Sequence, residues 1–124
     1  MLYHRSIFWD NDFDVICEAF VHQPFILSRH IKTKIKENNF EHLTEDMIIF
    51  AINKLRKNFN PPFEIETECG KIVKFVSRIQ ILNNQDMCVV FAVHDGFNKI
   101  KTAYINCHND NHKTLNCKKY YRGE

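Results

Sequence analysis

Residues 63–107 have the sequence FEIETECGKIVKFVSRIQILNNQDMCVVFAVHDGFNKIKTAYINC, in which four strand-like segments follow one another. Turn residues separate the segments at Gly70, at 83–86 and at Asp95-Gly96. The predicted strands are Phe63–Glu68, Ile72–Leu82, Cys88–Val93 and Lys99–Cys107. Because no helix-length segment lies between them, the pattern predicts an antiparallel meander.

The second and third segments indicate how the sheet is buried. Val73, Phe75, Ile79 and Ile81 share one face of the second segment. Residues 88–93 are wholly apolar, which is typical of a central strand buried on both faces.

Helical patterns precede Pro61-Pro62. A short helix is expected over Asp14–Val21, and an amphipathic helix over 26–37, where Leu27, Ile31 and Ile35 form one stripe. A further helix is expected over 44–58, with Thr44 as its N-cap. The expected fold is therefore α+β, with N-terminal helices packed on a four-stranded antiparallel meander sheet.

Length and composition favour one domain over residues 1–124. It divides into an N-terminal segment (1–24), a helical part (25–60), the sheet (61–107) and a tail (108–124). No apolar run of about 18 residues is present, so we expect no membrane segment. The five Cys form no CxxC pair, and the N-terminus does not resemble a signal peptide. A reducing, cytoplasmic setting is the simplest expectation, in the producing cell or in a target cell after delivery within a larger secreted protein.

Two groups of basic residues are candidates for binding phosphate. His30 and Lys34 lie one helical turn apart beside the apolar stripe, with Lys32 close by. Arg78 and Lys74 fall on the polar face of the second strand. An imidazole suits proton transfer, and Arg and Lys suit phosphate. The alternatives are a solvated helix face and an exposed sheet face.

The last strand and the loop after it form the chain's densest polar segment. Thr102, Tyr104 and Asn106 share one face of the strand, and His112, Lys113 and Thr114 follow in the loop. RNA cleavage needs a base, an acid and donors for the developing charge, and such side chains supply them without a metal or cofactor. The alternative is a polar loop that caps the domain.

A zinc site competes for the same segment. Cys107, His108, His112 and Cys117 include an H-x3-H spacing, but the spacing is irregular, and adjacent ligands at 107 and 108 fit a tetrahedral site poorly. Cys69 and Cys88 are expected to be ordinary turn or buried cysteines. The acidic residues show no two-metal cluster, so neither metal nor cofactor is expected.

Two segments resemble the group of small ribonucleases that unites barnase, EndoU, colicin-type and RelE nucleases, including contact-dependent inhibition toxins and phage-encoded relatives. They are Ile26–Ile35, and Thr102–Asn106 followed by Asp110, His112–Leu115 and Tyr120. The similarity spans roughly residues 25–120. It implies that active groups come from the first helix and the sheet, which maps them onto His30, Lys34, Arg78 and Thr102, with His112 and Thr114 as further candidates.

These observations predict a metal-independent ribonuclease toxin that cleaves RNA, with tRNA as the expected substrate. His30 would exchange a proton, Lys34 and Arg78 would bind the scissile phosphate, Thr102 would donate to it, and His112 would be the second acid or base. Substrate contacts are expected from Lys32, Lys74, Tyr104, Lys113 and Thr114.

A cognate inhibitor or immunity protein is the expected protein partner of such a toxin. Two alternatives remain open: a non-catalytic binding module (an immunity protein, antitoxin or phage inhibitor), favoured by the net charge of only +2 and the 11 Phe, and a zinc-stabilised nucleic-acid binder.

Overall fold

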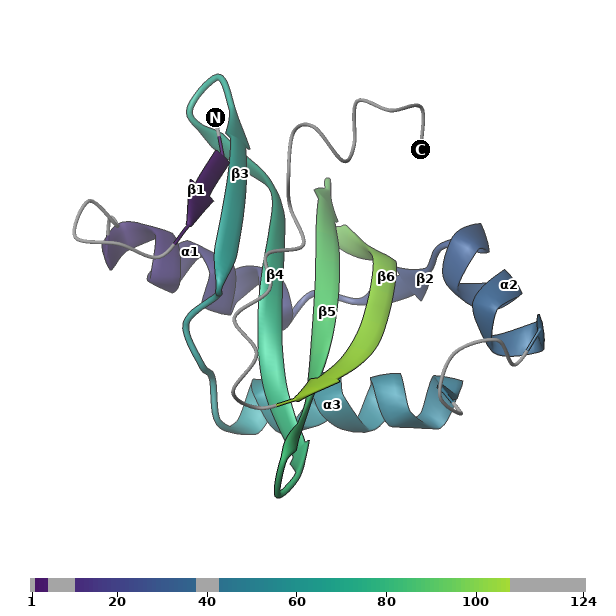
Figure 1. Cartoon of the computed structure of the whole chain (residues 1–124). Helices are drawn as coiled ribbons and strands as arrows, with labels where there is room; N and C mark the ends of the chain where they lie inside the picture. Colours follow the sequence, from purple (N-terminus) through teal and green to yellow (C-terminus); the bar gives the residue numbers. More distant parts are fainter. Residues whose placement is uncertain (1, 5–10, 38–42, 108–124) are drawn as a thin grey trace.

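The computed structural model describes residues 2–4, 11–37 and 43–107, which form an α+β fold. The elements are β1 (Leu2–His4), α1 (Asn11–Val21), β2 (Phe25–Leu27), α2 (Arg29–Glu37), α3 (Glu45–Lys57), β3 (Glu64–Glu68), β4 (Lys71–Leu82), β5 (Gln85–His94) and β6 (Phe97–Cys107). Helices α1 and α3 lie against one face of the sheet, and α2 lies at its edge (Figure 1).

The sheet has six strands among the described residues, in the order β1-β3-β4-β5-β6-β2. Its centre, β3 to β6, is the predicted antiparallel meander. The prediction of only four antiparallel strands was wrong at both edges. Strand β1 pairs antiparallel with β3, and β2 pairs parallel with β6, with Phe25 opposite Asn98. Neither edge strand exceeds three residues, which is too short to produce a periodic sequence signal.

The helix predicted over 26–37 begins later, at Arg29. Leu27 is buried in β2 rather than on the helical stripe that it appears to start. Ser28 ends the strand and caps the helix, because its Oγ accepts a hydrogen bond from the Ile31 amide at 3.2 Å. The Ser28 hydroxyl also donates to the Lys101 carbonyl at 2.9 Å, which holds the start of α2 against β6.

Helix α3 has the boundaries expected from its sequence. Thr44 Oγ1 accepts from the Met47 amide at 3.2 Å, and Lys54, Arg56 and Lys57 lie in the last turn. Arg56 also acts on a second helix: it donates to the carbonyls of Val21 and Gln23, at 2.9 and 2.7 Å, where α1 ends without a basic residue of its own. The bond to Val21 satisfies a carbonyl group that the end of α1 leaves unpaired, and the bond to Gln23 fixes the segment that follows the helix.

One apolar core lies between α1, α3 and the sheet. At its centre the Phe75 and Phe91 rings stack at 4.6 Å between centroids, and both side chains are fully buried. Register shifts in the sheet decide which residues reach this core. The shift between β3 and β4 turns Ile72 inward in place of Val73, so the predicted inward position of Val73 was wrong. The predicted burial of residues 88–93 on both faces is confirmed for 88–92, whereas Val93 is half-buried.

Replacing Phe91 with Ala should lower the free energy of unfolding by about 3–5 kcal/mol, because a fully buried ring is removed from a closely packed core. Val15→Ala on α1 is the control, since this side chain is 69% exposed, and it should change stability by less than about 0.5 kcal/mol. Urea unfolding followed by circular dichroism measures both. A loss below about 1 kcal/mol for Phe91→Ala would contradict this core.

Candidate functional site

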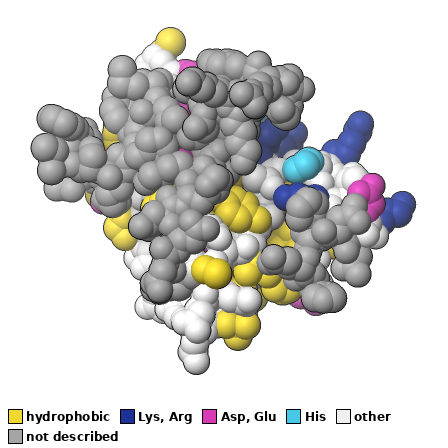
Figure 2. Space-filling model, viewed as in Figure 1, with side chains coloured by type: hydrophobic (Ala, Val, Ile, Leu, Met, Phe, Trp, Pro, Cys, Tyr) yellow, Lys and Arg dark blue, Asp and Glu magenta, His cyan; other side chains and the backbone are white. Residues whose placement is uncertain are grey.

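The face of the sheet turned away from α1 and α3, here called the front face, carries the polar side chains. The strand register arranges them in cross-strand rows. The rows are Glu66–Lys74–Ala92–Lys99, Glu64–Val76–Val90–Thr102, Arg78–Cys88–Tyr104 and Gln80–Asp86–Asn106. Lys and Arg side chains gather over α2 and the neighbouring end of the sheet, with a His among them (Figure 2).

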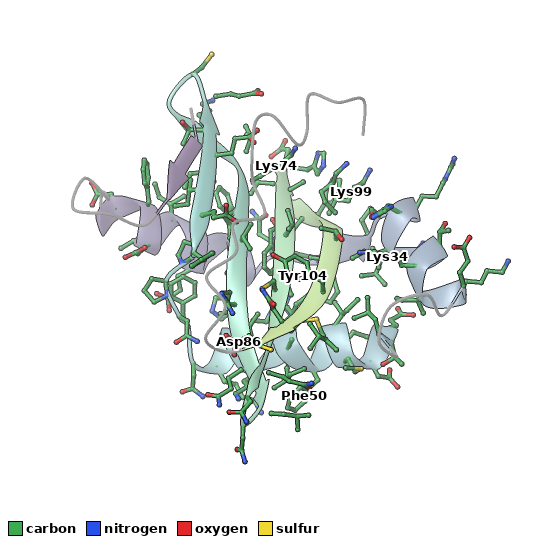
Figure 3. The ribbon with its side chains drawn as sticks, viewed as in Figure 1. Lys34, Phe50, Lys74, Asp86, Lys99 and Tyr104 are labelled. Carbon is green, nitrogen blue, oxygen red and sulfur yellow. The ribbon has the colours of Figure 1, made fainter. Side chains whose placement is uncertain are left out.

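The structure brings Lys34 and Thr102 together. Lys34 Nζ donates to Thr102 Oγ1 at 3.1 Å, although the two residues are 68 positions apart in sequence. Lys34 reaches from α2 toward β6 on the side where Tyr104 lies (Figure 3). Both partners of the hydrogen bond are only partly buried. An ammonium group and a hydroxyl therefore meet at one partly exposed point where helix and sheet join.

The other predicted residues of α2 lie around this point. His30 is exposed and precedes Lys34 by one turn, so the two side chains are neighbours on the same helix face. Lys32 is exposed but lies two positions from Lys34, so it projects from a different side of the helix. His30 is thus placed beside Lys34, whereas Lys32 is directed away from the Lys34–Thr102 contact.

Arg78 is held by several contacts rather than presented to solvent. Its side chain is 12% exposed, and Nε lies 3.3 Å from Asp86 Oδ2 as an ion pair without hydrogen-bond alignment. Its Nη2 donates to the Cys107 carbonyl at 2.9 Å, and the guanidinium lies 5.3 Å from the centre of the Phe63 ring. These contacts compete with the bidentate phosphate binding expected from the sequence. Arg78 instead supplies a fixed positive charge under the centre of the front face.

Tyr104 and Cys88 form a neutral pair beside Arg78. Burial raises the pKa of the Cys88 thiol to about 11, against the opposing effect of the Arg78 charge and the hydrogen bond with Tyr104. Burial also raises the pKa of the Tyr104 hydroxyl far above its usual range, assisted by Cys88 and Glu64. Tyr104 therefore keeps its proton at neutral pH and can donate a hydrogen bond, while Cys88 is not a thiolate nucleophile.

Two carboxylates on the front face were missed by sequence reasoning. Glu64 is fully buried opposite Val76, and Asp86 is 4% exposed beside Arg78. Glu64 lies in an alternating stretch with Glu66 and Glu68, and nothing in that pattern distinguishes it from its exposed neighbour Glu68. Asp86 lies in a stretch expected to be a turn, but β5 begins at Gln85. Both acids bring negative charge close to the Tyr104–Cys88 pair.

Lys74 is half-buried on β4 and shares a row with Lys99, which lies two strands away (Figure 3).

The predicted residues His112, Lys113 and Thr114 lie outside the described residues, as do His108, His112 and Cys117 of the zinc alternative. Within residues 2–4, 11–37 and 43–107 no group of three or more His, Cys, Asp or Glu side chains is placed to hold a metal ion.

Cys17 and Cys88 are buried, whereas Cys69, in the turn between β3 and β4, and Cys107 are exposed; none of these four forms a disulfide.

No helix in the described part of the chain is long and apolar enough to cross a membrane. Comparison with protein-family models, with curated proteins and with solved structures finds no match.

Cys88 should resist alkylation in the native protein. With a pKa of about 11, only about one thiol in a thousand is ionised at pH 8, and the side chain is 1% exposed. Treatment with iodoacetamide at pH 8, followed by peptide mass spectrometry, should label the exposed Cys69 and Cys107 and spare Cys88. Labelling in denaturant is the control and should reach all of them. Equal rates at Cys88 and Cys69 in the native protein would contradict the buried pair.

Proposed function

We propose that this chain is a metal-independent ribonuclease whose active site lies where α2 meets β6. The observation that carries the proposal is the Lys34–Thr102 hydrogen bond of 3.1 Å. It joins a helix that bears an exposed histidine to a strand face that bears a protonated tyrosine. Proton transfer and stabilisation of phosphate charge are the two requirements for cleaving RNA by its own 2′-hydroxyl.

In the proposed reaction the 2′-oxygen attacks phosphorus, and the bond from phosphorus to the 5′-oxygen breaks. One acid–base group takes the 2′-hydroxyl proton and another protonates the leaving 5′-oxygen. His30 fills one of these roles, and His112 is the proposed partner. Lys34, held in place by Thr102, stabilises the extra charge on the phosphate oxygens, with Tyr104 as a neutral donor.

Arg78 has a modified role in this proposal. Because Asp86 and the Cys107 carbonyl hold its guanidinium, it acts as a fixed charge in the same cross-strand row as Tyr104 rather than as a direct phosphate ligand. Lys74 and Lys32 contribute to the positive field that attracts the substrate. The proposed substrate is tRNA, and the biological outcome of its cleavage is toxicity.

The chemistry is tested by the ends of the cut RNA. Purified protein incubated with tRNA in EDTA should leave a 2′,3′-cyclic phosphate and a 5′-hydroxyl, identified by end-labelling and mass spectrometry. Cleavage that stops in EDTA, or that leaves 5′-phosphate ends, would contradict the proposal.

The site is tested by substitution on α2. His30→Ala should lower the cleavage rate by about 10²–10⁴-fold, as expected for a lost acid or base. Lys34→Met should lower it by about 10²–10³-fold, as expected for a lost donor to the developing charge. Lys36→Ala is the matched control, because Lys36 is exposed on the same helix two positions from Lys34, and it should change little. Full activity of His30→Ala would place the site elsewhere.

A cognate inhibitor is part of the proposal, since a ribonuclease must be restrained in the cell that makes it. We expect an acidic protein that covers α2 and the end of β6, because Arg29, Lys32 and Lys36 are exposed there. Association should slow markedly as salt is raised, as measured by stopped-flow fluorescence. A pull-down from the native host that yields no stoichiometric partner would count against it.

A second candidate, a non-catalytic binding module, is favoured by one feature. Phe50 and Leu82 are 56% and 63% exposed and line a mostly apolar hollow of about 320 Å³ with Asp46, Met47 and Ile81. Such a surface is typical of a protein contact. Expression of the chain alone in a bacterium separates the two functions: a ribonuclease stops growth and leaves cut tRNA, whereas a binding module does neither.

A further inference from the structure

The hairpin between β5 and β6 carries a pair of stacked rings at its tip. The His94 and Phe97 rings lie 4.9 Å apart between centroids, with 10° between their planes. They are cross-strand partners on either side of the Asp95-Gly96 turn, in which Gly96 takes a positive φ of 81°. His94 is exposed and Phe97 is half-buried, so the stacked pair borders solvent.

Lysine side chains lie next to this pair on the same face. Lys99 follows Phe97 by two positions on β6, so the two side chains share a face about 7 Å apart. Lys74 on β4 belongs to the same row, with the small Ala92 between the two lysines (Figure 3). Among the described residues the Lys99 side chain makes no hydrogen bond or ion pair, whereas Lys74 faces Glu66 across the strands. Lys99 is therefore the more available cation.

We propose that this end of the front face is a nucleotide subsite for single-stranded RNA. A base stacks on the His94–Phe97 pair, and the adjoining phosphate binds Lys99, with Lys74 adding positive charge. Flat aromatic surfaces accept any base by stacking, and ammonium groups bind backbone phosphates. In the described part of the chain this platform consists of two stacked rings beside lysines. A surface of that size and charge suits a single nucleotide.

The position of this subsite links it to the proposed cleavage site, and its substrate class rests on that proposed function. On the front face of β6, Thr102 is the next position after Lys99, since the register shift between β5 and β6 leaves Lys101 unpaired. The row of the subsite, which contains Lys99, is thus next to the row of Thr102, which accepts the hydrogen bond of Lys34. The subsite would hold the nucleotide adjacent to the scissile phosphate.

Binding is tested apart from cleavage with a fluorescein-labelled 2′-O-methyl RNA tetranucleotide, which has no free 2′-hydroxyl and cannot be cut by the proposed reaction. Fluorescence anisotropy should show that Phe97→Ala weakens binding by about 10-fold or more, because base stacking is lost. Phe97→Tyr keeps the ring and should bind like wild type. Phe50→Ala is the matched control, since this exposed Phe lies on α3, far from the hairpin (Figure 3).

The phosphate contact is tested by salt dependence. Lys99→Gln should reduce the slope of log K against log salt concentration by about 0.7, the value for one phosphate contact to a single strand. Lys57→Gln is the control, because Lys57 is an exposed lysine at the end of α3, and its slope should equal that of wild type. A slope for Lys99→Gln equal to that of wild type would contradict the proposed contact between Lys99 and a phosphate.

Each outcome separates the subsite from the catalytic proposal. If wild type does not bind the oligonucleotide, or if Phe97→Ala and His94→Ala both bind it as wild type does, the subsite is overturned even where RNA is cut. If Phe97→Ala does not fold, as judged by circular dichroism, His94→Ala decides the question, because His94 is exposed. If the predicted losses occur but no RNA is cut, the subsite stands and the ribonuclease proposal fails.

Discussion

The arrangement of the candidate site depends on the two hydrogen bonds of one serine hydroxyl. Ser28 Oγ donates to the Lys101 carbonyl and accepts from the Ile31 amide. One side chain therefore connects the end of β2, the start of α2 and Lys101, the β6 residue that the register shift leaves without a partner on β5. Strand β2 ends at Leu27, opposite Ile100, and no other strand among residues 2–4, 11–37 and 43–107 pairs with this edge of β6. Helix α2 begins there and fills that edge. Lys34 consequently reaches Thr102 instead of solvent.

The two faces of the sheet differ in what they bury. The face toward α1 and α3 buries apolar side chains, with Phe75 and Phe91 stacked at its centre. The front face buries a small apolar cluster of Val76, Cys88 and Val90. Beside it lie charged groups, with Arg78 paired to Asp86 and Glu64 close to Tyr104. Burying charges without stabilising contacts is costly, and such clusters are frequent at functional sites. Partly exposed donors surround this cluster, which is the arrangement that the ribonuclease proposal uses.

Much of the fold could be predicted because it follows from local periodicity. Helix α3 has an N-cap, acidic and basic ends and a regular apolar face, and β3 to β6 alternate between clear turns. Strand β2 could not be predicted, because three residues carry no period and their partner lies more than 70 positions away. The orientation of Val73 could not be predicted either. The register shift between β3 and β4 changes which residues of β4 face the core, and no residue in the sequence marks the shift.

The candidate site was predictable to a similar degree. Sequence spacing placed His30 and Lys34 on one helix face, and strand alternation placed Thr102 and Tyr104 on one sheet face. The burial of Glu64 and the ion pair of Arg78 with Asp86 depend on tertiary contacts between strands and were not foreseen. Arg78 is an example. An arginine on a polar sheet face suggested phosphate binding, but its guanidinium instead binds the Cys107 carbonyl and pairs with Asp86.

The central claim is that Lys34 and Thr102 act as one unit in cleaving RNA. A double-mutant cycle measures this directly, with kcat/KM for tRNA cleavage determined for Lys34→Met, Thr102→Val and the double variant. If Thr102 acts by holding Lys34, the double variant should lose no more activity than Lys34→Met alone. Losses that multiply, or a Thr102→Val variant with full activity, would contradict the account.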